Sequence, residues 1–108
     1  MKTIPASAKE RKRYILIKVE SDWKAEKNDI ERLVIQAGLQ FLGELNMARI
    51  GMQLVPESWN GKTAIVRVGH KYVDDVKAAL AFVKEFNGHK ITISALKVSG
   101  SIDKLGGN

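Results

Sequence analysis

The side chains that could act as acids, bases, nucleophiles or metal ligands are few and scattered along this sequence. Its two histidines, His70 and His89, flank a predicted helix and have no carboxylate at ligand spacing, so we expect no metal site. Asp74 and Asp75 are adjacent, and on a helix they would point about 100° apart, which excludes an acid–base pair. Ser99 lacks the Gly-x-Ser-x-Gly pattern of a nucleophile elbow, and the chain contains no cysteine. The sequence therefore predicts no catalytic residue, and no metal or cofactor bound by the protein itself.

Basic side chains are the most prominent functional groups, and they are unevenly distributed. The 108 residues include 18 Lys and Arg against 12 Asp and Glu, a net charge of +6. Residues 1–18 hold six basic residues and one acidic residue, residues 19–57 hold four and seven, and residues 58–108 hold eight and four. Lys and Arg contacts to phosphates release counterions and supply most of the sequence-independent affinity for nucleic acids. This segregation predicts a positive surface, contributed by both ends of the chain, for a polyanionic partner.

The first half of the chain shows a strand pattern followed by a helix pattern. Residues 13–19 place Ile15, Ile17 and Val19 on one face, which predicts a buried strand. A helix is expected to begin at Ile30, with Asn28 or Asp29 as its cap. Its apolar residues recur at the helical period and should face the core. These residues are Ile30, Leu33, Val34, Ala37, Phe41 and Leu45.

The second half repeats this order and completes a known topology. A second helix is expected over residues 72–86 and should stop at Asn87–Gly88. Further strands are predicted over residues 49–55, 63–68 and 90–98. The order βαββαβ predicts an α+β fold, a ferredoxin-like (RRM-like) sandwich with a four-stranded antiparallel sheet and both helices on one face.

The length and composition indicate one domain. We expect a flexible basic arm over residues 1–9, a single ferredoxin-like RNA-binding domain over residues 10–105, and a tail over residues 106–108. No apolar run is long enough for a membrane span, and no signal peptide follows the basic N-terminus. The absence of cysteine fits a reducing compartment, so we expect a cytoplasmic protein without a membrane partner.

The first helix carries a second apolar face, about 150° around the helix from the first. Ile35, Leu39 and Leu42 form it. A helix packed on one sheet needs a single apolar face, so this one either widens the core or binds another protein.

An RNA-binding ferredoxin-like domain often stacks bases on aromatic side chains, but only 6% of these residues are aromatic. We therefore expect cationic side chains to contact the backbone of folded RNA. The alternative is a regulatory or protein-interaction module that does not act on RNA. The candidate RNA-binding residues are Lys9, Arg11, Lys12, Arg13, Lys18, Arg67, His70, Lys71, Lys97 and Lys104.

Several segments, taken in order, resemble the family of archaeal ribonuclease P protein component 2, the counterpart of a small Pop-type subunit of eukaryotic ribonuclease P/MRP. The resemblance spans about residues 11–105. The chain departs from the family pattern at Asp103. The segments that carry the resemblance are Arg13–Ile15, Val66–Val73, Ala78–Ala81 and Val98–Ile102.

This resemblance implies a protein subunit of ribonuclease P, an RNA-based endonuclease that removes the leader from precursor tRNA. It implies that the RNA, with bound magnesium, performs the chemistry and that the protein supports it. It also implies three kinds of partner: the catalytic RNA with its precursor tRNA substrate, a TIM-barrel-like protein subunit, and a second copy of the chain in a homodimer.

Overall fold

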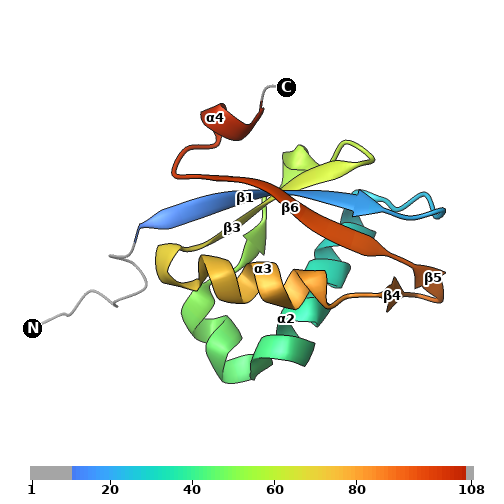
Figure 1. The fold of residues 1–108 in the computed structure, drawn as a ribbon, viewed down its shortest axis with the longest axis horizontal. Coiled ribbons are helices and arrows are strands. Elements are labelled where there is room, and N and C mark those ends of the chain that lie inside the picture. Colours follow the sequence, from blue (N-terminus) through green and yellow to red (C-terminus); the bar gives the residue numbers. More distant parts are fainter. Residues whose placement is uncertain (1–10, 107–108) are drawn as a thin grey trace, which may run out of the picture.

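A four-stranded antiparallel sheet forms the centre of the molecule (Figure 1). The computed structural model describes residues 11–106, so the predicted arm over residues 1–9 lies outside the described residues, as do residues 107–108. The strands follow the order β2-β3-β1-β6, and every pair is antiparallel. Their bounds are β1 Lys12–Glu20, β2 Gln53–Leu54, β3 Thr63–Gly69 and β6 Thr92–Ser99. This order confirms the predicted ferredoxin-like topology.

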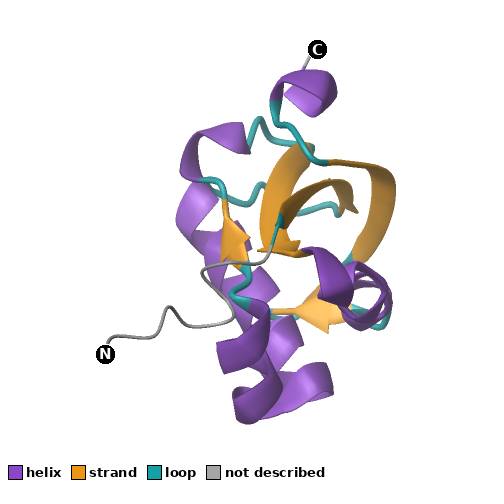
Figure 2. Ribbon diagram, turned by 90° about the vertical axis from the view of Figure 1, so that its left-hand side faces the viewer, coloured by secondary structure: helices purple, strands orange, loops and turns teal. Residues whose placement is uncertain are grey.

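Two helices, α2 (Lys27–Ile50) and α3 (Val73–Ala81), cover one face of the sheet (Figures 1 and 2). The core between these layers confirms the predicted apolar faces of β1 and α2. Ile15 and Ile17 from the central strand and Ile30 from α2 are fully buried. Ala64, Val66 and Val68 of β3 complete the layer from the neighbouring strand.

Helix α2 bends sharply at Gly43, which has φ 85° and ψ 161°. The predicted stripe therefore ends early: Ala37 is buried, but Phe41 is 39% exposed and Leu45 is 68% exposed. The bend brings the second half of the helix back against the first, where Met47 occupies the space that a side chain at Gly38 would need. Placing Leu45 in the core was wrong because the periodicity assumed a straight helix, and Leu45 follows the bend. Placing Phe41 there was also wrong, because Phe41, just before the bend, packs against the exposed ring of Phe82 instead.

The predicted strand over residues 49–55 is shorter than expected, because α2 continues to Ile50. Gly51 ends the helix in the left-handed region, with φ 64°, and its N–H donates to the Met47 carbonyl. Gln53 and Leu54 pair in register with β3, and the Val55 N–H donates one further hydrogen bond to the Ile65 carbonyl of that strand. The apolar residues of this segment, Ile50, Met52 and Leu54, are nonetheless all buried.

The second helix ends at Ala81 rather than Phe86, and a small hairpin follows it. Strands β4 (Glu85–Phe86) and β5 (His89–Lys90) flank Asn87–Gly88. Both turn residues have positive φ, 52° and 80°, as a two-residue hairpin turn requires. Reading this dipeptide as a helix stop was wrong, because the same residues also favour a tight hairpin.

The last strand and the segments around it differ in detail from the prediction. Strand β6 is an edge strand whose register against β1 shifts between Leu16 and Ile17. Ile91 and Ile93 are buried as expected, whereas Ala95 is exposed. Short helical turns, η1 (Pro56–Ser58), η2 (His70–Tyr72) and α4 (Asp103–Gly106), follow β2, β3 and β6.

Gly43→Ala is expected to lower the free energy of unfolding by about 1–3 kcal/mol, because the backbone conformation of Gly43 is strained for any residue with a Cβ. No atom of the described residues lies within 4 Å of the position of an added Cβ, so the cost is conformational rather than steric. Urea unfolding measures it. Gln40→Ala, an exposed position in the same helix, is the control and should change stability little. A Gly43→Ala protein as stable as the parent would show that the bend does not depend on glycine.

The N-terminus of α2 is capped by Glu26 rather than Asn28, and Asp29 occupies the third helical position. The Glu26 N–H donates to Asp29 Oδ2 at 3.0 Å, and Arg32 Nη2 donates to Asp29 Oδ1 at 3.1 Å. The pKa of Asp29 lies below its ordinary value, chiefly because its carboxylate accepts the backbone hydrogen bond from Glu26. Asp29 thus forms part of a capping box rather than the cap itself.

Asp29→Ala is expected to lower the thermal midpoint at neutral pH. Because the pKa of Asp29 is lower in the folded than in the unfolded chain, its ionised form stabilises the fold above the unfolded value of about 3.9. That contribution is lost as the pH falls through the folded-state pKa. The difference between the parent and Asp29→Ala should therefore shrink in acid, as followed by circular dichroism. A difference that grows in acid would contradict this role.

Candidate nucleic-acid interface

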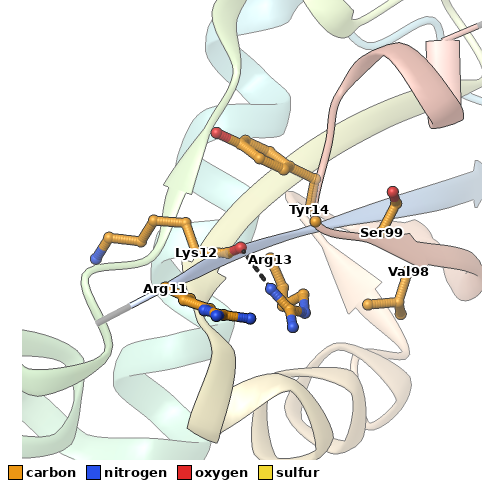
Figure 3. A pocket seen from close by; sticks show the side chains of 7 residues that line it. Arg11, Lys12, Arg13, Tyr14, Val98 and Ser99 are labelled. Carbon is orange, nitrogen blue, oxygen red and sulfur yellow. Dashed lines mark hydrogen bonds between the residues drawn. The ribbon is translucent and has the colours of Figure 1, made fainter. Parts of the chain in front are cut away.

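The first residues of β1 and the last residues of β6 border an open groove of about 630 Å³ (Figure 3). Two register pairs bring these segments together, Tyr14 with Ser99 and Ile15 with Val98. Three consecutive cations, Arg11 just before β1 and Lys12 and Arg13 at its start, give the groove a concentration of positive charge at one end of the sheet. The lining residues are Arg11, Lys12, Arg13, Tyr14, Val98, Ser99 and Gly100.

Strand alternation directs these cations to both faces of the sheet. Lys12 and Tyr14 have the opposite parity from buried Ile15, so they lie on the face that α2 and α3 leave open. Arg13 shares the parity of Ile15 and lies on the helix side. Figure 3 shows Lys12 and Tyr14 above the β1 ribbon and Arg11 and Arg13 below it. Positive charge therefore lies on both faces of the sheet at the N-terminal end of β1.

The cations of the groove are free of carboxylate partners within residues 11–106. Arg13 Nη1 donates to the Lys12 carbonyl at 3.2 Å, and no ion pair involves Arg11, Lys12 or Arg13 in this part of the chain. A Cβ at Gly100 would lie 3.2 Å from Arg13 Nη1, so the absence of a side chain there leaves room for the guanidinium. Unpaired charges at one site suit a phosphate-bearing ligand.

His70 and Lys71 join the same end of the sheet. The backbone N–H of His70 donates to the Arg11 carbonyl at 2.9 Å, and His70 Nδ1 lies 3.3 Å from the same oxygen. The pairing of Lys12 with Gly69 fixes this arrangement, because η2 begins directly after Gly69. Both side chains are exposed. The structure thus brings together Arg11, Lys12, Arg13, His70 and Lys71 from the predicted set.

The other predicted RNA-binding residues lie elsewhere or outside the described chain. Lys18 is six residues along β1 from Lys12, roughly 20 Å away, and its Nζ lies 3.6 Å from Glu20 Oε2. Lys97 stands opposite Leu16 on the open face, and Lys104 is exposed on α4. Arg67 lies on the open face beside Tyr14. Lys9 lies outside the described residues.

The three residues of the predicted partner-binding face differ in their exposure. Ile35 is 42% exposed and Leu39 is 43% exposed, whereas Leu42 packs partly against the core. A second exposed apolar pair, which the sequence analysis did not identify, lies across the two helices: the Phe41 and Phe82 ring centroids are 5.4 Å apart. Phe41 lies just before the bend at Gly43, and Phe82 follows the last residue of α3 directly.

Residues 13–106 match the Rpp14/Pop5 family. The chain belongs to this family. Ribonuclease P protein component 2 of Pyrococcus horikoshii is 36% identical over 97% of this chain and 88% of the relative. The protein of that name from Pyrococcus furiosus is 36% identical over 96% and 87%, and that from Methanocaldococcus jannaschii is 32% identical over 96% and 76%. The resemblance inferred from the sequence is thereby confirmed.

The Rpp14/Pop5 fold also recurs in a chain of the cryo-EM structure of yeast ribonuclease MRP. The two folds superpose with a TM-score of 0.70 over 94% of this chain and 79% of that chain, at 16% identity. That likeness supports the ferredoxin-like architecture. Within residues 11–106, no helix is both long and apolar enough to cross a membrane, and no group of three His, Asp or Glu side chains is placed to hold a metal ion.

Proposed function

We propose that this Rpp14/Pop5 chain is a protein subunit of ribonuclease P and supports the catalytic RNA in removing the leader from precursor tRNA. The observation that carries the proposal is the groove at the start of β1, where Arg11, Lys12 and Arg13 have no carboxylate partner within residues 11–106. The similarity to proteins named ribonuclease P protein component 2 supports ribonuclease P as the enzyme of which the chain is a subunit. The chain itself is not a catalyst in this proposal, and magnesium is bound by the RNA.

The proposed mechanism is electrostatic. A folded catalytic RNA brings phosphates close together, and their mutual repulsion opposes folding. Cations at the N-terminal end of β1 replace diffuse counterions beside those phosphates, and the release of the counterions favours binding. Arg11 and Arg13 have planar guanidinium groups, each of which can donate two hydrogen bonds to one phosphate. Lys12 adds a point charge on the opposite face of the sheet. His70 and Lys71 extend this contact along the same edge.

Reconstitution with the catalytic RNA tests the proposal. Adding the chain, together with a TIM-barrel-like protein subunit, should increase cleavage of precursor tRNA at low magnesium, because protein cations lower the demand for metal ions. The chain alone should leave the precursor intact. Cleavage that is indifferent to the chain would favour a protein-interaction module that does not act on RNA. Such an assembly would operate in the cytoplasm.

The protein partner is proposed to bind the outer face of α2. Ile35 and Leu39 are exposed there and Leu42 borders them, so an apolar surface on a TIM-barrel-like subunit or a second copy of the chain can cover all three.

Leu39→Glu is expected to weaken co-purification with the TIM-barrel-like subunit at least tenfold, because it buries a charge in the contact. Leu45→Glu, at a more exposed position beyond the bend, is the control and should bind like the parent. Size-exclusion chromatography of each variant alone reports a change in self-association. Undiminished pairing of Leu39→Glu would remove this face from the interface.

A further inference from the structure

A row of polar side chains crosses the open face of the sheet from one edge to the other. Gln53 of β2 pairs with Arg67 of β3, Arg67 pairs with Tyr14 of β1, and Tyr14 pairs with Ser99 of β6. Their neighbours Leu54, Val66 and Ile15 are buried in the core, so alternation places all four of these side chains on the opposite face. An amide, a guanidinium, a phenol and a hydroxyl therefore stand side by side.

Arg67 is the unexplained member of this row. Its side chain is half-buried, and its Nε is buried without a hydrogen-bond partner in the described part of the chain. Among residues 11–106 it forms neither a side-chain hydrogen bond nor an ion pair. A charge that is partly removed from water and left without a counterion is costly, and such groups are normally satisfied by a ligand, an ion or ordered water. Because Nε itself is buried, an anionic group beside Tyr14 would supply the missing counterion by contact with the terminal Nη groups of Arg67.

Tyr14 connects this row to the cationic groove. Its ring is half-buried, lines the groove with Arg13 and Ser99, and rises from the open face of β1 (Figure 3). The C-terminal turn α4 packs against β6 on the side of the sheet away from α3 (Figure 2). There Leu105 is only 6% exposed, as is Ile65 on the open face of β3. The polar row thus lies beside a covered, apolar part of the same face.

We propose that this row binds one unpaired nucleotide of an RNA, with its base stacked on the Tyr14 ring and a phosphate beside Arg67. Gln53 and Ser99 flank the two with hydrogen-bonding groups. Base stacking on an aromatic side chain tolerates any base, whereas the guanidinium selects the phosphate, so the site recognises an unpaired nucleotide rather than a sequence. This inference rests on the proposed function and adds the stacking of one base to the phosphate contacts of the groove.

Binding of a fluorescently labelled oligouridylate to the purified full chain tests the site. Tyr14→Leu keeps an apolar side chain over the sheet but cannot stack, and we expect its affinity to fall about tenfold with an unchanged salt dependence. Tyr14→Phe keeps the ring and should bind like the parent. Arg67→Gln should reduce the slope of log affinity against log salt by about 0.7, the contribution of one phosphate contact on a single strand. Thermal unfolding verifies that each variant is folded.

A blunt RNA duplex, which offers no unpaired base, is the matched probe. Tyr14→Leu should leave its affinity unchanged. Equal binding of the oligouridylate by Tyr14→Leu and the parent would overturn the site, and so would an equal loss for both probes, which would mean that Tyr14 only shapes the groove. Failure of the proposed function gives a different result, because replacing Arg11, Lys12 and Arg13 by Ala would then leave binding of both RNAs unchanged.

Discussion

Replacing Arg11, Lys12 and Arg13 together by Ala is expected to lower the affinity for the catalytic RNA about a hundredfold or more at moderate salt. The three side chains line one groove and have no carboxylate partner within residues 11–106, so each is available to a phosphate. Each phosphate contact contributes about 0.7 (on a single strand) to 0.9 (on a B-form duplex) to the slope of log affinity against log salt. The slope should therefore fall by about two to three units, as measured by filter binding over a salt series.

A variant with the same loss of charge elsewhere separates local contact from net charge. Lys24, Lys27 and Lys62 are exposed, and Lys24 and Lys62 line a pocket with Lys18, at the opposite end of β1 from the groove. Replacing these three by Ala should reduce affinity slightly and leave most of the slope. Equal effects of the two triple variants would show that RNA senses only the overall charge and would remove the groove from the contact surface.

Ile15→Ala is expected to lower the free energy of unfolding by about 2–5 kcal/mol. Ile15 is fully buried at the centre of β1, where it pairs with Val66 on one side and Val98 on the other. Removing its side chain leaves a cavity between the sheet and the helices. For a domain of this size the loss corresponds to a thermal midpoint lower by about 10–30 °C. Urea or thermal unfolding measures both quantities.

Leu16→Ala provides the comparison on the same strand. Leu16 points to the open face and is only half-buried, so its truncation should cost less than that of Ile15. A larger cost for Leu16 would mean that the principal core lies on the open face. RNA affinity should remain close to that of the parent in any Ile15→Ala sample that is still folded, since Ile15 does not line the groove.

The strands and the core could be predicted because their signals are local. Alternation around Ile15 and Ile17 predicts β1 over residues 13–19, and the structure extends this strand by one residue at each end. The order of elements then predicts the ferredoxin-like sheet, because few topologies accommodate it. The apolar stripe of α2 was predicted correctly up to Ala37, although the helix begins at Lys27 rather than Ile30.

Features that depend on backbone conformation or long-range pairing could not be predicted in the same way. A glycine inside a helical pattern does not reveal the φ of 85° at Gly43 that redirects α2, so the exposure of Leu45 beyond the bend was not predicted. Asn87–Gly88 suits both a helix end and a hairpin, and packing of Phe86 in the core selects the hairpin. Sequence order likewise does not pair Tyr14 with Ser99, so the cations Arg11–Arg13 were predicted to bind RNA but the groove that they form with the end of β6 was not.

Proximity cleavage from single introduced cysteines shows directly whether RNA binds at the start of β1. The chain contains no cysteine, so a hydroxyl-radical reagent can be attached to one introduced residue. Ser99→Cys places it in the groove, and Ser21→Cys places it just beyond the other end of β1, roughly 20 Å away. We predict strong, localised scission of the catalytic RNA from position 99 and little from position 21. Scission from position 21 alone, or equally from both, would contradict the account.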